Sequence, residues 1–485
     1  AGTLAMQPTE RGPLPRPVGF GPVRLPELTY DACPGKGMNY PSLNRSVFGG
    51  EPDNWLIGHC RRVAISYAEE PTVRRAAASG GVITATLLYL LEHGLIDGAV
   101  VVRQGSPQPW LAEPAIATTA DEIRAASQSV YAPIPVNVLL ERMERFDGAL
   151  AYVGLPDQVA SLRALQAAGH PAVQKVRYVL GLYMGTNMYA AAIESYLRAN
   201  GVSSLKEVVE LRYRAGEWPG HLLIRTRDPS GRGRVLRAEK FYYNYLIPFY
   251  ITQSTLYSVD FSNELTDISV GDAWHPRYEA QGGGFSVVVA RSEAGQELLA
   301  AMQEAGALHL EDLDIHSALA MHGHMLDFKK RGSFIRMEWR AARGLPIPDY
   351  GYRPASIPLS RRLVEVIITS LFALCGTRAA RRLAELIPIQ ILQFVTTEGS
   401  QPIRQACTPF ILRLIVQRTR TELAYWLRRE WNFADVGAHW DATEDYDDIN
   451  AETYSYFRRF IDGLRLSNLP DGAHVLDLCA RTGNG

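Results

Sequence analysis

Short apolar runs alternate along this chain with segments whose apolar residues recur at helical spacing. Residues 81–92 (GVITATLLYLLE) show the helical period and stop before Gly94, which predicts a helix. Residues 97–103 (DGAVVVR), 148–154 (GALAYVG) and 176–181 (VRYVLG) are short and apolar or β-branched, which predicts strands. This alternation predicts an α/β fold with a mixed or largely parallel sheet and covering helices.

The same patterns predict further elements on both sides of this region. We expect helices at residues 121–127, 157–168 and 189–200, and strands at residues 222–227, 235–238, 268–270 and 286–290.

Proline content and charge divide the chain into four predicted segments. They are a Pro-rich extended arm (residues 1–32), a compact α/β unit (33–345, with parts 33–145 and 146–345), an Arg-rich helical segment (346–432) and the start of another domain (433–485).

The composition narrows the function classes. Hydrophobic residues make up 47% and charged residues 21% of the 485 positions, so the chain can bury substantial cores. A net charge of −1 argues against a nucleic-acid binder. The cysteines form no CxxC pair, which argues against a disulfide framework and a local zinc site. They are Cys33, Cys60, Cys375, Cys407 and Cys479.

The expected location is the cytoplasm. The Pro-rich N-terminal residues lack the apolar core of a secretory signal. Apolar runs such as residues 363–375 and 410–416 are shorter than the ~18–20 residues of a spanning helix.

Two glycine-containing loops are candidate sites. Ser79-Gly80-Gly81 opens the helix that carries Thr84, so its backbone N–H groups either approach a phosphate or form a plain helix N-terminus. Residues 154–158 (GLPDQ) join a strand to a helix, where Asp157 is either an ordinary N-cap or part of a cofactor site at the carboxyl end of the strand.

A third candidate loop, residues 260–274, is dense in acidic residues around a short strand. It fits either a solvated turn with a structural network of aspartates or part of a site.

Six stretches, in order, resemble the coenzyme F(420) hydrogenase/dehydrogenase beta-subunit family, which includes the flavin subunit of deazaflavin-reducing hydrogenases and 7-hydroxymethyl chlorophyll a reductase. The stretches are ACPGKGMNY (32–40), ASGGVITATLLYLLEHGLIDGAVVV (78–102), QSVYAPIP (128–135), VGLPDQVASLR (153–163), LGLYMGT (180–186) and VDFSNELTDISVGDAW (259–274).

This resemblance implies FAD and, usually, one or two [4Fe–4S] clusters. It implies that the flavin's diphosphate side is lined by Ser79, Gly80, Gly81 and Thr84, with Ser129, Tyr131, Gly154, Pro156 and Gln158 nearby.

Departures from the family pattern change the expected cofactors. The positions of four customary thiolates carry Asp157, Met184, Thr255 and Ser258, so we expect no cluster and no metal ligands. The family's Ser-Lys-Tyr motif appears as residues 129–131 (SVY), which removes a positive charge that could face a phosphate or the flavin.

Two functions follow from this resemblance. The first is a flavin-dependent oxidoreductase that moves electrons or hydride between a diffusible donor and a small-molecule acceptor. Asp157 is then the candidate general acid, unless it is an ordinary N-cap. The second is a non-catalytic scaffold that docks to a partner protein or a membrane. A homo-oligomer is compatible with either function.

Residues 353–430 contain twelve arginines and no lysine, interleaved with apolar blocks. This pattern fits either a basic amphipathic helix on an anionic membrane or a helical hairpin whose arginine stems cover the α/β unit.

The last residues, 473–485 (AHVLDLCARTGNG), resemble the first strand and loop of a SAM-dependent methyltransferase, with Asp477, Gly483 and Gly485. Cys479 and Arg481 replace two customary glycines, and the given chain ends at Gly485. We therefore expect an incomplete Rossmann-like domain and no SAM binding by these residues alone.

Overall fold

A computed structural model describes residues 4–7, 14–17, 26–228, 230–238 and 244–386. Contacts between Cα atoms divide the chain into residues 1–409 and residues 410–485. The predicted helices after residue 386 and the methyltransferase-like start at residues 433–485 lie outside the described residues.

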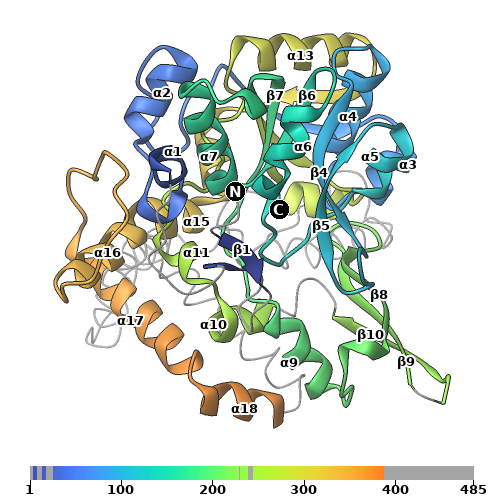
Figure 1. The fold of residues 1–485 in the computed structure, drawn as a ribbon, viewed down its shortest axis with the longest axis vertical. Helices are drawn as coiled ribbons and strands as arrows, with labels where there is room; N and C mark the ends of the chain where they lie inside the picture. Colours follow the sequence, from blue (N-terminus) through green and yellow to red (C-terminus); the bar gives the residue numbers. More distant parts are fainter. Residues whose placement is uncertain (1–3, 8–13, 18–25, 229, 239–243, 387–485) are drawn as a thin grey trace, which may run out of the picture. The chain divides into compact units, whose positions relative to one another are not determined.

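An eight-stranded sheet forms the centre of the α/β unit (Figure 1). Its spatial order is β13 (Leu308–Asp312), β3 (Arg62–Ala68), β12 (Ser286–Ala290), β11 (Ile268–Asp272), β7 (Val176–Leu182), β6 (Leu150–Gly154), β4 (Gly98–Gln104) and β5 (Ala112–Ala117). The four strands from β11 to β4 are parallel, and the pairs at either side are antiparallel. The predicted mixed α/β sheet is therefore confirmed.

Helices cover both faces of this sheet because successive strand residues point to opposite sides. In β4, Ala99 and Val101 join one hydrophobic core while Val100 joins the other. The first core contains α3 (Pro71–Ala76), α4 (Val82–Glu92), α5 (Ala120–Ala125) and α13 (Glu293–Glu304). The second contains α2 (Tyr40–Phe48), η2 (Val136–Leu139), α6 (Leu140–Arg145), α7 (Pro156–Ala167), α8 (Pro171–Gln174) and α16 (Ser333–Ala341).

A smaller antiparallel sheet has its own core. It consists of β8 (Val208–Ala215), β9 (His221–Arg227) and β10 (Gly233–Ala238), in the order β10-β9-β8. Apolar residues of this sheet pack against α9 (Ala191–Ala199) and α10 (Ile247–Tyr250).

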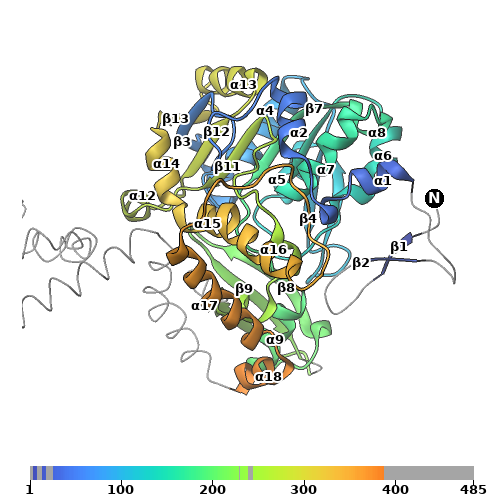
Figure 2. The same cartoon turned by 90° about the vertical axis from the view of Figure 1, so that its left-hand side faces the viewer.

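A layer of helices follows in the chain (Figure 2). It consists of α15 (Gly323–Asp327), the π-helix η5 (Phe328–Gly332), α16, α17 (Leu359–Cys375) and α18 (Arg378–Leu386). Val364 and Ile368 of α17 pack against Phe328, so the described part of the Arg-rich segment packs on the α/β unit.

No single helix of the described residues is long and apolar enough to cross a membrane. Helices α17 and α18 together have the length and the apolar composition of a membrane-spanning segment. They are bent by 76° at the break between them.

The described residues also form several shorter elements. They are β1 (Leu4–Gln7) paired with β2 (Leu14–Pro17), α1 (Glu27–Asp31), η1 (Pro34–Lys36), η3 (Leu205–Glu207), α11 (Gln253–Tyr257), α12 (Pro276–Gln281) and α14 (Ile315–Met321).

Candidate functional site

A cavity of about 410 Å³, named the main cavity for its place at the large sheet and not for its size, lies at the carboxyl ends of the parallel strands. Its wall includes Gly154 at the end of β6, Tyr183 just after β7 and Asp272 at the end of β11. Ligands of open α/β sheets bind in this position because the strand ends and the following loops leave a crevice there.

The N-terminus of α4 faces this cavity. Gly81 is the N-cap residue with φ of 81°, and no side chain of the described residues caps the helix. Thr84 lines the cavity from the first turn. The first-turn N–H groups and the helix dipole therefore favour an anion at this end of the cavity.

The first two residues of the Ser-Gly-Gly loop are tied to β12. The Ser79 hydroxyl donates to the carbonyl of Phe285 at 2.7 Å, and the Gly80 N–H donates to Ser286 Oγ at 3.0 Å. A Cβ on Gly80 would lie 2.6 Å from the carbonyl oxygen of Ser66. Gly80 thus permits close packing of the loop, and it is not among the residues that line the cavity, whereas Ser79 is.

Residue 130, where the family motif has a lysine, carries no positive charge. Another buried cation nevertheless borders the cavity. Arg214 of β8 lines the cavity and forms an ion pair with Asp272 at 2.9 Å. The Tyr131 hydroxyl lies beside Arg214 and Ser129, and burial raises the pKa of Tyr131. Sequence patterns gave no signal for Arg214, because it reaches the cavity from the smaller sheet.

Three polar atoms in the cavity wall have no hydrogen-bond partner among the described residues. They are Oε1 of Gln128, the hydroxyl oxygen of Tyr183 and Nε2 of His322. Gln128 has φ of 80°, a left-handed conformation that is uncommon for a residue with a side chain and that recurs at binding sites. Buried polar atoms are normally paired. These atoms therefore support the binding of a ligand that has hydrogen-bond donor and acceptor groups.

The ring of His322 packs against two aromatic rings that also contact each other. The centroids of Tyr183 and Phe261 each lie 5.2 Å from that of the imidazole. Burial lowers the pKa of His322 to about 4, so the ring is neutral at pH 7. No sequence motif indicated this histidine.

The loop at residues 154–158 is fixed by Gln158. Its Oε1 accepts from the N–H of Leu155 at 2.9 Å, and its Nε2 donates to the carbonyl of Ile134 at 2.9 Å. Gly154 and Gln158 line the main cavity, whereas the buried Pro156, the first residue of α7, is not among the lining residues.

Asp157 is not the N-cap of α7, which corrects one of the two interpretations. The N-cap residue is Leu155, and Asp157 lies one position inside the helix after Pro156. Asp157 instead lines a side cavity of about 190 Å³ that borders the main cavity. The proline takes the first helical position and displaces the carboxylate from the capping position.

The four positions that lack thiolates converge at this side cavity. Asp157, Met184 and Thr255 line it, and Ser258 lies next to it on the same turn as Thr255. The ammonium of Lys329 donates to Ser258 Oγ at 2.5 Å and to the carbonyl of Thr255 at 2.9 Å. These residues do not fit an iron–sulfur cluster, because they provide no thiolate and a lysine side chain is packed among them.

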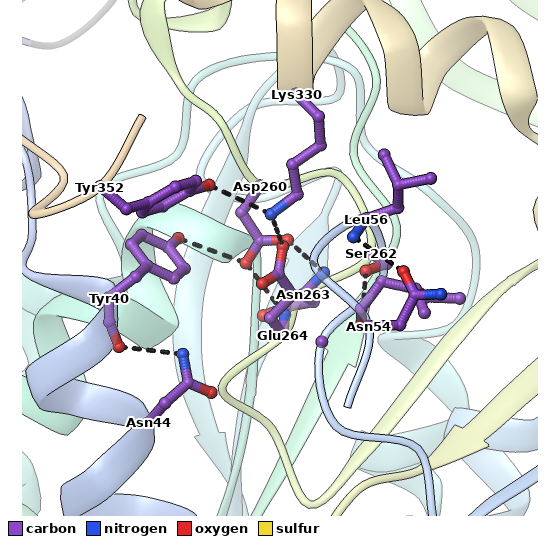
Figure 3. A network of polar contacts seen from close by, with 12 residues as sticks. Tyr40, Asn44, Asn54, Leu56, Asp260, Ser262, Asn263, Glu264, Lys330 and Tyr352 are labelled. Atoms are coloured by element: carbon purple, nitrogen blue, oxygen red, sulfur yellow. Dashed lines mark hydrogen bonds and ion pairs between the residues drawn. The ribbon is translucent and has the colours of Figure 1, made fainter. Parts of the chain in front are cut away.

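The acidic loop after α11 is buried, so a solvated turn is the wrong interpretation. Asp260 and Glu264 are 1% and 3% exposed. Asp260 accepts from the N–H groups of Asn263 at 2.8 Å and Glu264 at 2.9 Å (Figure 3). Glu264 pairs with the buried ammonium of Lys330, which also donates to Tyr352 at 3.2 Å.

The pKa values in this network follow from burial and pairing. Burial raises the pKa of Glu264 to about 7, against the opposing effect of Lys330. Burial lowers the pKa of Lys330, but Glu264 and the other acidic groups around it together raise that pKa above its ordinary value, so the ammonium stays charged. Within the described part of the chain, no group of three His, Cys, Asp or Glu side chains is placed to hold a metal ion.

The predicted catalytic and cofactor-binding residues thus fall into two groups. Those that line the main cavity are Ser79, Gly81, Thr84, Ser129, Tyr131, Gly154 and Gln158. Gly80, Pro156 and Asp157 lie behind or beside it.

Two family models match the chain. Both describe the beta subunit of coenzyme F420 hydrogenase/dehydrogenase. The model of its N-terminal part covers residues 64–141, and the model of its C-terminal part covers residues 147–316. Together they span about half of the chain.

Named relatives also match the chain. The beta subunit of the coenzyme F420 hydrogenase of Methanothermobacter thermautotrophicus is 24% identical over 306 residues, 60% of this chain and 99% of that protein. The coenzyme F420-dependent sulfite reductase of Methanocaldococcus jannaschii is 26% identical over 56% of this chain, which matches only 42% of that protein.

A solved structure was also matched. A chain of the F420-reducing [NiFe] hydrogenase complex from Methanosarcina barkeri is 20% identical, with a TM-score of 0.48 over 62% of this chain and 99% of that chain.

Proposed function

Because the chain belongs to the coenzyme F420 hydrogenase/dehydrogenase beta-subunit family, we propose that it is a flavin-dependent oxidoreductase. In this proposal it moves electrons or hydride between a diffusible donor, such as a reduced deazaflavin or nicotinamide, and a small-molecule acceptor, without an iron–sulfur cluster. Relatives named as a hydrogenase subunit and a sulfite reductase support redox chemistry.

The uncapped N-terminus of α4 in the wall of the main cavity carries the proposal. It offers backbone N–H groups for the diphosphate of FAD, with the Thr84 hydroxyl on the first turn and Ser79 just before it. The unpaired atoms of Gln128 and His322 are available to the polar edge of the isoalloxazine ring. Bound FAD would supply the two-electron chemistry, and the chain would supply binding and orientation.

Four features of the chain would act on the reaction. The neutral imidazole of His322 adds no charge to the cavity, and Arg214 places a guanidinium there. The apolar part of the wall excludes water, which strengthens electrostatic interactions inside the cavity. Asp157 in the adjoining side cavity is the proposed general acid, because burial raises its pKa above the ordinary value.

The first test is the visible absorption spectrum of the purified protein, followed by acid release and identification of any cofactor. Maxima near ~370 and ~450 nm, without a broad absorbance near ~400 nm, are expected of FAD without a cluster. A colourless protein that also fails to bind added FAD would exclude a flavoenzyme. A brown protein with acid-labile sulfide would exclude the cluster-free form.

A pair of variants tests the position of the diphosphate. Thr84→Glu puts a carboxylate at the N-terminus of α4 inside the cavity, and we expect it to weaken FAD binding by about tenfold or more, equivalent to ~1.4 kcal/mol. Thr72→Glu makes the same change on the exposed surface of α3 and should leave the Kd unchanged. Equal Kd values in a fluorescence titration would place the diphosphate elsewhere.

A second candidate function is docking to an anionic membrane. Leu359, Leu363, Ile367 and Leu374 of α17 are each more than half exposed. Helix α18 adds Arg378, Arg381 and Arg382. Exposed apolar side chains next to arginines suit the surface of a bilayer that contains anionic lipids.

Flotation with phosphatidylserine-containing vesicles tests this candidate. We expect a Leu363→Ser/Ile367→Ser/Leu374→Ser variant to lose flotation, whereas Val209→Ser/Val235→Ser, which changes exposed apolar residues of the smaller sheet, should retain it. Absence of flotation for the unmodified protein would exclude membrane docking.

A further inference from the structure

A second cavity, which we call the arginine groove, is separate from the main cavity. Its volume is about 1030 Å³, and it shares no lining residue with the main cavity. Its walls come from α9, α10, α11, α16, α17 and α18. Helix α17 contacts both α16 and α18 (Figure 2). The groove is therefore formed where the helical layer meets the helices that cover the smaller sheet.

Positive charge is concentrated in this groove. Seven arginines and two glutamates line it. Arg198 pairs with Glu194 at 3.7 Å and with Glu385 at 2.6 Å. Arg336 pairs with the buried Glu365 at 2.6 Å. Because like charges around a concave surface repel one another, an anion bound among the remaining arginines is favoured. The arginines that form no ion pair with a carboxylate of the described residues are Arg340, Arg343, Arg378, Arg381 and Arg382.

Two of these five guanidinium groups are held in place in the same way. Nε of Arg381 donates to a backbone carbonyl at 2.8 Å, and its guanidinium lies 4.7 Å from the centroid of the Tyr250 ring. Nε of Arg340 donates to a backbone carbonyl at 2.7 Å, and its guanidinium lies 5.3 Å from the centroid of the Tyr257 ring. No described residue accepts a hydrogen bond from the Nη groups of either arginine. These N–H groups are therefore available to a phosphate, which guanidinium binds at two points.

Aromatic rings form much of the remaining wall. Trp339, the largest of them, is half-buried and directly precedes Arg340 on α16. A planar heteroaromatic ring stacks on such side chains with little dependence on its exact structure. The groove thus offers guanidinium groups and stacking surfaces side by side. The lining rings are Tyr189, Phe249, Tyr250, Tyr257, Trp339 and Phe372.

The groove and the exposed apolar surface of α17 lie on different faces of that helix. Thr369, Phe372 and Ala373 line the groove, whereas the exposed Leu363 and Ile367 do not. A bilayer would contact the exposed apolar face. The groove is therefore suited to a ligand that is free in solution.

We propose that the arginine groove binds a nucleoside diphosphate or triphosphate. Arginines that include Arg340 and Arg381 bind its phosphates, and Trp339 stacks on its base. A nucleotide combines in one small molecule the negative charge and the planar ring that the two parts of the groove complement. The site does not depend on the flavin proposed for the main cavity.

Isothermal titration calorimetry with ATP, pyrophosphate and adenosine tests the groove in the whole chain. We expect ATP to bind, pyrophosphate to bind about tenfold more weakly or worse, and adenosine alone not to bind. Arg340→Gln/Arg381→Gln should weaken ATP binding by about tenfold or more, because two charges that bind phosphate are lost. Trp339→Leu should weaken ATP binding by about fivefold or more and leave pyrophosphate binding unchanged, because it affects only the base.

Control variants separate the groove from other anion sites. Arg142→Gln/Arg227→Gln removes two exposed arginines outside the groove and should leave the Kd for ATP unchanged. Thr84→Glu, in the main cavity, should also leave it unchanged. If the first double variant fails to fold, Arg343→Gln/Arg378→Gln replaces it, because both side chains are exposed at the rim of the groove and the same loss of ATP binding is expected.

Absence of ATP binding would overturn the proposal, as would a Kd that Thr84→Glu raises and the groove variants do not. A polyglutamate peptide that binds more tightly than ATP, with dependence on Arg340 and Arg381, would identify a protein-docking surface instead. Displacement of ATP by phosphatidylserine vesicles would identify a lipid surface. A colourless protein that still binds ATP in the groove would exclude the flavoenzyme and leave this site.

Discussion

The guanidinium of Arg214 contacts the carboxylate of Asp272 at two points, with Nη1 to Oδ2 at 2.9 Å and Nη2 to Oδ1 at 3.3 Å. Arg214 belongs to β8 of the smaller sheet, and Asp272 ends β11 of the large sheet. The indole N–H of Trp218 also donates to Asp272 at 3.3 Å. This ion pair therefore joins the two sheets at the wall of the main cavity.

Replacement of Arg214 should destabilise the protein. Arg214→Met leaves Asp272 as a largely buried carboxylate without its cation, which we expect to lower the free energy of unfolding by about 3–5 kcal/mol. Arg214→Lys retains the charge but not the two-point geometry and should cost less. Urea denaturation measures both, with Arg225→Met on the exposed face of β9 as the control. Equal losses in Arg214→Met and Arg225→Met would contradict this role.

His322 should make stability depend on pH below neutrality. Its pKa is lowered from 6.5 to about 4 by burial, so between these values the unfolded chain binds a proton that the folded protein does not. Stability is therefore lost as the pH falls from 6.5 to 4, by about 3 kcal/mol in total.

Thermal unfolding at several pH values, compared between the unmodified protein and His322→Phe, measures this effect. A phenylalanine ring can pack against Tyr183 and Phe261 as the imidazole does and cannot be protonated, so the variant should lose less stability over this range. His316→Gln, at an exposed position, should behave as the unmodified protein does. A variant as acid-sensitive as the unmodified protein would show that His322 is not the group responsible.

The ion pair of Glu264 and Lys330 should be strongly coupled. Glu264→Gln leaves a fully buried ammonium without its carboxylate, and we expect a loss of about 3–5 kcal/mol. Lys330→Met should cost a similar amount. The double variant should lose less than the sum of both, because it leaves no unpaired charge. A double-mutant cycle by urea denaturation gives the coupling free energy, and additive losses would contradict the pairing.

Gly80 should tolerate no side chain. A Cβ there would lie 2.6 Å from the backbone oxygen of Ser66 and 3.0 Å from Ser286 Oγ. We expect Gly80→Ala to cost about 1–3 kcal/mol through displacement of the loop that opens α4. Gly233→Ala, whose Cβ would have 3.7 Å of clearance, is the matched control in the same thermal unfolding assay. Equal melting temperatures for the two variants would show that the loop can shift freely.

The elements with the strongest apolar periodicity could be predicted from the sequence. The helix predicted at residues 81–92 is α4, and the strand predicted at residues 286–290 is β12 with the same bounds. Strands β3, β5, β8 and β13 were not predicted. β8 and β13 carry charged residues within short runs, and β3 has polar or small residues at alternate positions. Pairing with neighbours far away in the chain, which the local pattern does not contain, stabilises these strands.

The candidate site could be predicted only in part, for the same reason. The glycine loop and the 154–158 turn are local motifs at the ends of elements, and the structure places both at the cavities. Lys329 and Lys330 stand in the run FKKRG, which in sequence looks like a solvated basic patch. The two lysines are buried because the helices that carry them pack against partners more than 60 residues earlier in the chain. The local sequence pattern gives no indication of this packing.

The π-helix at Phe328–Gly332 also limits how the length of the chain can change. A π-turn holds one more residue than an α-turn, and each residue rotates a helix by about 100°. Loss of one residue within it would let α15 and α16 continue as a regular α-helix but would turn the two lysines away from Ser258 and Glu264. Insertions and deletions in relatives that retain this pair of lysines should therefore fall in surface loops, and the spacing between α15 and α16 should stay constant.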